Sequence, residues 1–237
     1  MKIISKVTIH PISYVITIIF FLMGYFRKYI TFMIIIFIHE LGHVITAICL
    51  KWKIEKIVIL PFGCLIKFKE YINRPIKEEF IISIMGIIFQ LLFSLKINIY
   101  YNIVIIIFNL IPIYPLDGSK ILNLFFNKIG NFKFSFYLSI VISYFILLIL
   151  LVQIFIKKDL ISFLIIIPLL LEVIRNHKNI YCIYNKFYLE RYLYNFKFKK
   201  IKIINNINKM KRDYAHIIKC KDKYLTENVF LRNMFDK

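Results

Sequence analysis

The chain has few of the residues from which covalent staples and thiolate metal sites are built. Four cysteines occur in 237 residues, at the scattered positions Cys49, Cys64, Cys182 and Cys220, and no C-x-x-C pair is present. Disulfide frameworks and cysteine-based zinc sites use cysteines at characteristic spacings. Neither feature is therefore expected.

Acidic residues are also scarce, with 13 Asp and Glu against 33 Lys and Arg, for a formal net charge of +20. Such an excess indicates a nucleic-acid partner when it forms a face on a soluble domain. Here 16 of the basic residues lie from Arg175 onward and 7 lie between Lys51 and Lys77, outside the long apolar runs. This distribution is typical of cytoplasmic loops near anionic lipid, so no nucleic-acid partner is predicted.

Apolar residues dominate, with 60% hydrophobic and 17% aromatic residues and a mean hydropathy of +0.72. This excess indicates an integral membrane protein in contact with the lipid bilayer. The start of the chain, MKIISKVTIHPISYVITIIFFLMGYF, is basic and then apolar but lacks a small-residue cleavage site. We therefore expect it to be retained as a first membrane span.

An all-α polytopic membrane fold with about six transmembrane helices follows from the apolar pattern. The segments are roughly Ile12–Tyr25, Tyr29–Leu50, Phe80–Leu95, Asn98–Pro112, Phe134–Ile156 and Leu160–Ile174. Some fall short of the ~20 residues of a straight span, which implies tilt or bilayer thinning. Residues 1–174 are predicted to form the transmembrane core and residues 175–237 a short basic tail. The charge asymmetry places both termini in the cytoplasm.

Two segments outside the spans carry strand-like patterns. In KIEKIVILPFGCLIKFKE, residues 53–70, apolar runs on either side of Pro61 and Gly63 predict two short strands or a re-entrant turn. An ordinary amphipathic loop at the interface is the alternative. The end of the tail predicts two short strands around Lys221–Lys223 and a small helix capped by Thr226, too little for an independent catalytic domain.

Three ionisable side chains interrupt the apolar run IFIHELGHVITA, residues 36–47. His39 and His43 are four residues apart, so a helix projects both from nearly one face, with Glu40 beside them. This spacing lets two imidazoles reach one metal ion while the glutamate reaches a metal-bound water. A charge near the bilayer centre costs about 2.5–3.5 kcal/mol, which favours a functional site over a polar patch that only joins helices.

A catalytic zinc ion usually has three protein ligands, so a third is sought among the acids before the tail. Glu55 and Glu70 lie in the basic loop, where cationic neighbours give them an ordinary role. Glu78 and Glu79 precede a helix, where acids favour the positive end of the helix dipole. Asp159 follows two lysines on the face predicted to be external.

Asp117 remains the best candidate for the third ligand, and Glu172 at the end of the last span is a peripheral candidate. Asp117 lies in FNLIPIYPLDGSKIL, residues 108–122, where Pro112 and Pro115 stop an apolar helix that restarts after Gly118. Broken backbone at membrane depth is tolerated where it is buried in protein or lines a wet cavity. An acid at such a break is a good metal ligand; the alternative is a surface turn.

The other polar residues of interest are open to two interpretations. Asn109, two turns before Asp117, either hydrogen-bonds a substrate backbone or caps the adjacent helix end. His10, His177 and His216 have no partners at ligand spacing and are expected to be structural or solvated.

With FIHELGHVITA and NLIPIYPLDGSKIL both present, the chain resembles the site-2 protease family of intramembrane zinc metalloproteases. Further matches are LPFGC, NRPIKEEF and the pair His10–Pro11, all within about the first 125 residues. The resemblance implies one zinc ion held by the side chains of His39, His43 and Asp117, with Glu40 as catalytic acid/base. It also implies that Asn109 and the prolines around it, Pro112 and Pro115, help to position a protein substrate.

The resemblance further implies regulated proteolysis of a membrane-associated sigma factor precursor during sporulation, in the mother-cell membrane around the forespore, with membrane-protein inhibitors as further partners. Departures from the family pattern are Gly118–Ser119 in place of Gly-Gly and Gly86–Ile87 in place of Gly-Pro. The tail is shorter than a CBS domain, and the spans flanking Lys96 leave no room for a PDZ domain. Alternatives are a site-2 protease with another membrane substrate, or a non-catalytic metal-binding membrane protein.

Overall fold

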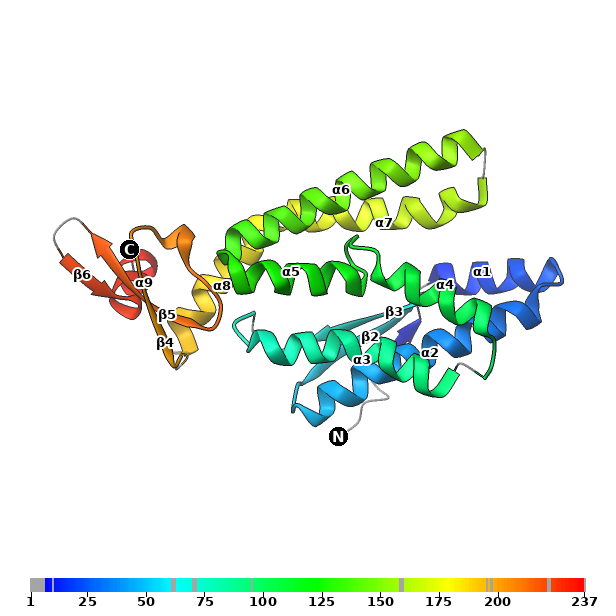
Figure 1. The fold of residues 1–237 in the computed structure, drawn as a ribbon, viewed down its shortest axis with the longest axis horizontal. Helices are drawn as coiled ribbons and strands as arrows, with labels where there is room; N and C mark the ends of the chain where they lie inside the picture. Colours follow the sequence, from blue (N-terminus) through cyan, green and yellow to red (C-terminus); the bar gives the residue numbers. More distant parts are fainter. Residues whose placement is uncertain are drawn as a thin grey trace. The chain divides into compact units, whose positions relative to one another are not determined.

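The computed structural model describes residues 7–9, 11–60, 63–69, 72–94, 96–157, 160–194, 196, 198–220 and 223–236 (Figure 1). His10, Pro61, Asp159 and Lys221, which entered the sequence predictions, lie outside these residues. The chain divides into two compact units, Met1–Glu70 with Ile81–Phe108 and Tyr71–Phe80 with Asn109–Lys237. This division follows packing, and the predicted core (1–174) and tail (175–237) stay a prediction about membrane embedding.

The first unit combines a small sheet with four apolar helices. Its elements in chain order are β1 (Val7–Ile9), α1 (Pro11–Leu22), α2 (Phe26–Cys49), β2 (Ile54–Leu60), β3 (Gly63–Phe68) and the parts of α3 (Ile76–Ser94) and α4 (Ile99–Leu110) that lie within residues 81–108. Strands β2 and β3 form an antiparallel hairpin, which confirms the strand alternative for the second loop. Strand β1 pairs in parallel with β2, so residues 7–9 belong to a sheet.

The turn between α1 and α2 depends on a glycine. Gly24 has a φ of +74°, in the left-handed region that residues without a Cβ enter most easily. Its N–H donates to Phe21 O at 3.1 Å and closes the end of α1. Helix α2 then runs for 24 residues and carries the predicted histidine pair.

The second unit begins with helices and ends with a second sheet. Its elements are α5 (Asp117–Ile129), α6 (Phe132–Lys157), α7 (Leu160–Lys178), α8 (Ile180–Tyr194), β4 (Lys200–Ile204), the 3₁₀ turn η2 (Ile207–Lys209), β5 (Tyr214–Cys220), β6 (Lys223–Thr226) and α9 (Glu227–Phe235). β4 lies parallel to β5, and β6 lies antiparallel to it. The predicted strands and the helix beginning after Thr226 are confirmed, although the Thr226 side chain makes no capping hydrogen bond.

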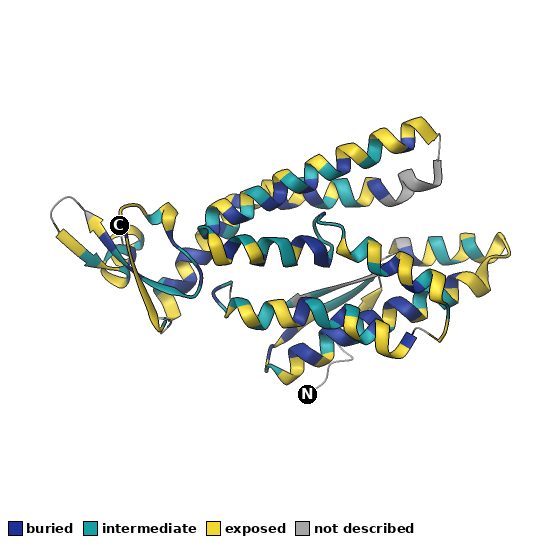
Figure 2. Ribbon diagram, in the orientation of Figure 1, coloured by how far each residue is buried: buried dark blue, intermediate teal, exposed yellow. Residues whose placement is uncertain are grey.

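The all-α class therefore needs a correction, because the described residues include two three-stranded sheets beside the helices. Each of the six predicted apolar segments overlaps a helix, namely α1, α2, α3, α4, α6 and α7, and the last two segments lie entirely within theirs. Of the described helices, α2 and α6 are long and apolar enough to cross a bilayer. Apolar side chains also cover the outside of these units, with Leu22 78% and Ile156 76% exposed (Figure 2). Crossing by all six segments stays a prediction.

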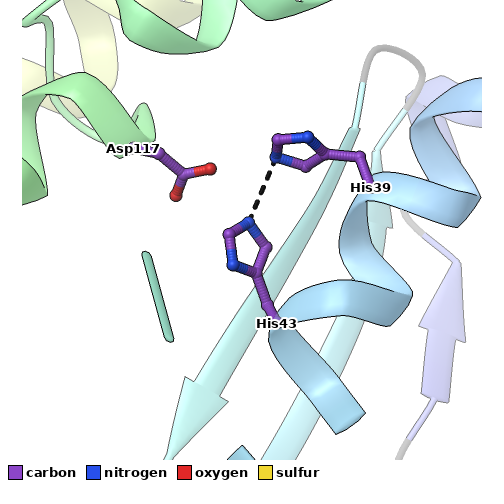
Figure 3. Close-up of side chains that lie close together, drawn as sticks. All are labelled: His39, His43 and Asp117. Atoms are coloured by element: carbon purple, nitrogen blue, oxygen red, sulfur yellow. Dashed lines mark hydrogen bonds between the residues drawn. The ribbon is translucent and has the colours of Figure 1, made fainter. Parts of the chain in front are cut away.

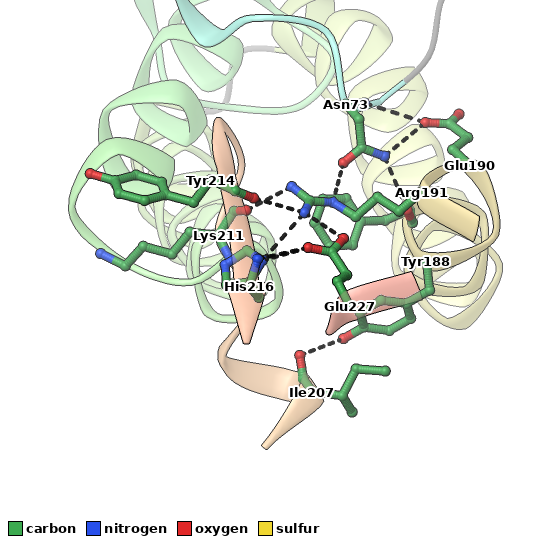
Figure 4. A network of polar contacts seen from close by, with 10 residues as sticks. Asn73, Tyr188, Glu190, Arg191, Ile207, Lys211, Tyr214, His216 and Glu227 are labelled. Carbon is green, nitrogen blue, oxygen red and sulfur yellow. Dashed lines mark hydrogen bonds and ion pairs between the residues drawn. The ribbon is translucent and has the colours of Figure 1, made fainter. Parts of the chain in front are cut away.

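A buried arginine organises the end of the second unit (Figure 4). The side chain of Arg191 donates to Asn73 Oδ1 at 2.7 Å and to the main-chain oxygens of Tyr214 and Lys211 at 2.9 and 2.8 Å. It also forms an ion pair with Glu227 at 2.8 Å. Arg191 is 2% exposed, so these contacts replace the water that a guanidinium otherwise requires.

His216 completes this network. Its Nε2 accepts from Lys211 N at 3.1 Å, and its Nδ1 lies 3.1 Å from Glu227 Oε2. Because Nε2 is an acceptor, the hydrogen of the neutral ring is on Nδ1 and is donated to Glu227. The structural alternative predicted for His216 therefore fits its surroundings.

Glu227 gives this network a pH dependence. Burial alone raises the pKa of Glu227, but the hydrogen bond from His216 and the charge of Arg191 outweigh it, so its pKa lies below the usual 4.5. The ionised form therefore contributes stability above that pH, and the contribution is lost as the pH falls through the lower folded value. The pKa of Glu190 shifts in the opposite direction, because burial of this carboxyl group raises it.

We expect Glu227→Gln to lower the protection of β5 and α9 amides at pH 6 by about 3 kcal/mol, because it leaves Arg191 buried without its counter-charge. The fall in protection between pH 6 and 3 should also be smaller than in the native chain. Hydrogen exchange on the full chain in detergent measures both effects. The control is Arg232→Gln, which removes the ion pair with Asp236. Because the Arg232 side chain is 76% exposed, protection should change by less than about 1 kcal/mol. An unchanged pH profile in Glu227→Gln would contradict the assignment.

Candidate metal centre

Helix α2 brings two histidines to one buried face. His39 and His43 are 1% and 5% exposed, and their Nε2 atoms lie 3.1 Å apart. A tetrahedral zinc ion with Zn–N bonds of about 2.0–2.1 Å holds two nitrogens roughly 3.4 Å apart. The observed spacing is close to what one shared zinc ion requires.

The other ring nitrogens fix the state of both imidazoles. His43 Nδ1 lies 2.7 Å from Ile82 O, a carbonyl that only accepts. His39 Nδ1 lies 2.9 Å from Gln90 Oε1, which is likewise an acceptor. Both Nδ1 atoms therefore carry a hydrogen, and the two Nε2 atoms lie within hydrogen-bond distance of each other, at 3.1 Å. Two imidazole nitrogens at this separation fit one shared metal ion.

Helix α3 approaches the histidines through a glycine. A Cβ at Gly86 would overlap His43 Cε1 and Nε2 and would lie 2.8 Å from His39 Nε2. Ile82, Gly86 and Gln90 are four residues apart, so they share one face of α3. On this face, the main-chain carbonyl of Ile82 and the side-chain amide of Gln90 bind the imidazoles, and Gly86 leaves space for the rings.

Asp117 lies where the sequence predicts a break in the helices. Helix α4 ends at Leu110 and α5 begins at Asp117, while Ser143 on α6 contacts the segment between them. Ser143 Oγ accepts from Tyr114 N at 3.1 Å and donates to Pro112 O at 3.4 Å. Asp117 is 4% exposed, so the alternative of a surface turn is wrong.

The neighbours of Asp117 show how the acid is held. Lys120 Nζ lies 2.8 Å from Asp117 Oδ1. A Cβ at Gly118 would overlap the carbonyl oxygens of Leu110 and Ile111, so α5 can begin here only because that residue has no side chain. A buried carboxylate needs such partners to remain ionised.

The three candidate ligands drawn in Figure 3, His39, His43 and Asp117, are all buried. The peripheral candidate Glu172 instead pairs with Arg175 at 3.0 Å. Glu40 is half-buried on α2, and Asn109, Pro112 and Pro115 are half-buried at the break. The roles of these four residues stay predictions.

Two contributors to the site were missed at the level of the sequence, Gly86 and Gln90. Gly86 was noted only as a departure from the family's Gly-Pro pair. Gln90 stands in the apolar run IISIMGIIFQLLF, residues 81–93. The cost of burying a polar group, which singled out the histidines, also applies to this amide and would have pointed to it.

Residues 28–100 match Peptidase family M50. The chain therefore carries an M50 peptidase domain, the class of the site-2 proteases.

Two curated proteins share this region. The chain is 35% identical over 146 residues to stage IV sporulation protein FB of Bacillus subtilis, covering 54% of this chain and 50% of the relative. It is 32% identical over 117 residues to the zinc metalloprotease MJ0392 of Methanocaldococcus jannaschii, covering 42% and 34%. The chain thus spans half or less of the length of these relatives.

The fold is similar to that of a solved site-2 protease. The site-2 protease from Methanocaldococcus jannaschii superposes with a TM-score of 0.58 at 22% identity, over 72% of this chain and 89% of that one. The M50 domain and the two helices that are long and apolar enough to cross a bilayer make the chain an integral membrane protein.

We expect Gly86→Ala to lower zinc affinity by about 10–100-fold, the range found when residues around metal ligands are substituted. Alanine favours a helix by about 0.5–1 kcal/mol over glycine, so α3 itself should not be weakened. Competition with a chelating dye measures affinity, and circular dichroism measures helicity. Ile88→Ala, at a residue 37% exposed on the same helix, is the control. Native zinc affinity in Gly86→Ala would show that the histidines do not need this gap.

Proposed function

We propose that this chain is an intramembrane zinc metalloendopeptidase that performs regulated proteolysis. The observation that carries the proposal is the buried histidine pair, whose two Nε2 atoms lie 3.1 Å apart. An M50 domain over residues 28–100 supports the same conclusion. His39, His43 and Asp117 are the proposed ligands of one zinc ion.

Bound zinc would supply Lewis-acid polarisation of a carbonyl and would lower the pKa of a bound water. Glu40 is the proposed acid/base: it takes the proton from the attacking water and delivers it to the leaving amine. It follows His39 directly on α2 and is offset by about 100° around the helix axis. Asn109, Pro112 and Pro115 are proposed to position the substrate backbone.

The proposed substrate is the pro-sequence of a membrane-associated sigma factor precursor in a sporulating cell. The similarity to stage IV sporulation protein FB supports this choice. Another membrane substrate is the alternative, because the chain covers 50% of that relative. Cytoplasmic termini, a place in the mother-cell membrane around the forespore and membrane-protein inhibitors belong to the same proposal.

The hairpin of the first unit suggests how an extended substrate is held. Among the described strands, β3 is an edge of the order β1-β2-β3, and an edge strand can pair with a further strand. Helical substrate hides its peptide bonds in hydrogen bonds and has to unwind before attack. Pairing with β3 by β-augmentation would stabilise the unwound segment.

We expect Glu40→Gln to reduce cleavage of a co-expressed sigma factor precursor by at least about 100-fold while zinc content stays at one ion per chain. His39→Ala should lose both zinc and cleavage. Immunoblotting for precursor and product measures cleavage, and atomic absorption of the purified chain measures zinc. Glu55→Gln, at an exposed position on β2, is the control.

The outcomes separate the alternatives. Undiminished cleavage by Glu40→Gln would refute the acid/base role. Zinc binding by the native chain without cleavage of this precursor, but with cleavage of another membrane protein, would replace the proposed substrate. Zinc binding without cleavage of the precursor or of another membrane protein would favour a non-catalytic metal-binding protein.

A further inference from the structure

We infer that Gln90 is a positioning residue of the metal centre and that Asn102 and Ser94 hold its amide in the orientation that this role requires. The inference rests on the proposed metal centre and concerns how the centre is built. It assigns a task to a buried amide in an apolar helix.

Gln90 is completely buried, at 0% exposure. Its Oε1 lies 2.9 Å from His39 Nδ1, and its Nε2 donates to Asn102 O at 3.1 Å and to Asn102 Oδ1 at 3.3 Å. A buried amide left without such partners costs about 1–3 kcal/mol. Gln90 therefore has one stable arrangement, with its oxygen toward the imidazole and its nitrogen toward Asn102.

Asn102 determines which way the Gln90 amide points. Asn102 Nδ2 donates to Ser94 O at 2.7 Å and to Asn98 O at 2.8 Å, and both of these carbonyls only accept. Asn102 Oδ1 is consequently the acceptor, and it faces Gln90 Nε2 and the Ser94 hydroxyl, the latter at 2.5 Å. The Asn102 orientation is thus fixed by main-chain groups, and it fixes the next amide in turn.

These hydrogen bonds from Asn102 through Gln90 determine which tautomer His39 adopts. With Gln90 Oε1 as acceptor, a ring hydrogen is on Nδ1, so Nε2 is the nitrogen that would bind a metal ion. The hydrogen bond also fixes the rotation of the ring. Such partners of metal-bound histidines typically contribute 10–100-fold in metal affinity.

The two histidines differ in how they are oriented. His43 uses Ile82 O, a main-chain atom that no substitution removes. His39 uses a side chain, and that side chain depends on Asn102 and Ser94. The position of His39 is therefore encoded in three polar residues of α3 and α4, and substitutions can test it separately from His43.

A purely structural role is the competing explanation, in which Gln90 only ties α3 to α4 through Asn102. Gln90→Glu separates the two roles, because a carboxylate still accepts from His39 Nδ1 but cannot donate to Asn102. Gln90→Leu removes both contacts. Thr46→Val is the control, because Thr46 is a buried residue of α2 whose hydroxyl donates to Gly42 O at 2.8 Å.

The experiment uses the purified full chain in detergent with Zn²⁺ and Co²⁺ as probes. We expect zinc affinity, from competition with a chelating dye, to fall 10–100-fold in Gln90→Leu. In Gln90→Glu it should recover to within about threefold of native even if melting shows lower stability, and Thr46→Val should bind as the native chain does. In the Co²⁺ protein, the hyperfine-shifted Nδ1–H signal of His39 should exchange faster with water in Gln90→Leu.

Native zinc affinity in Gln90→Leu would overturn the inference. So would equal losses of affinity in Gln90→Glu and Gln90→Leu, which is the result of a structural role. Should Gln90→Leu fail to fold, the Gln90→Glu and Asn102→Asp chains still decide, because the second keeps the shape of Asn102 but removes its Nδ2 donors. Failure of the native chain itself to bind zinc would instead contradict the proposed function.

Discussion

The metal centre depends on one constraint, the orientation that α3 imposes on the two imidazoles of α2. The Nε2 atoms of His39 and His43 lie 3.1 Å apart, and both residues are buried. Nothing in α2 alone enforces this, because a free histidine ring rotates or exchanges its tautomer. The constraint comes from α3, through Ile82 O and Gln90 Oε1. Helix α3 therefore acts as the template against which the histidines of α2 are oriented.

The sequence predicted the parts that carry a local signature. The helices followed from apolar runs, the β2–β3 hairpin from the residues around Gly63, and the histidine pair and Asp117 from the cost of placing ionisable groups in lipid. The pairing of β1 with β2 was missed, because it joins segments some 50 residues apart. The contribution of α3 was missed because periodicity shows that a face is buried but does not show which residues pack against it.

The second unit shows that its basic residues are not all on the surface. The sequence predicts residues 175–237 as a short basic tail. Arg191 is 2% and Arg212 4% exposed, and Arg212 pairs with Glu79 at 2.8 Å. These arginines stabilise the packing of the unit around Asn73 and the second sheet. Composition does not distinguish a buried, paired arginine from a solvated cation, since both raise the net charge equally.

Gly86 also limits how the first unit can move. One residue of rotation turns a helix by about 100° and shifts it by 1.5 Å. Either displacement of α3 would replace the gap at Gly86 by the side chain of a neighbour and would withdraw Ile82 O and Gln90 from the imidazoles. The contacts between α2 and α3 therefore fix both the rotation and the translation of one helix relative to the other. Motions that admit a substrate have to occur elsewhere in the chain, with this pair of helices moving as one rigid piece.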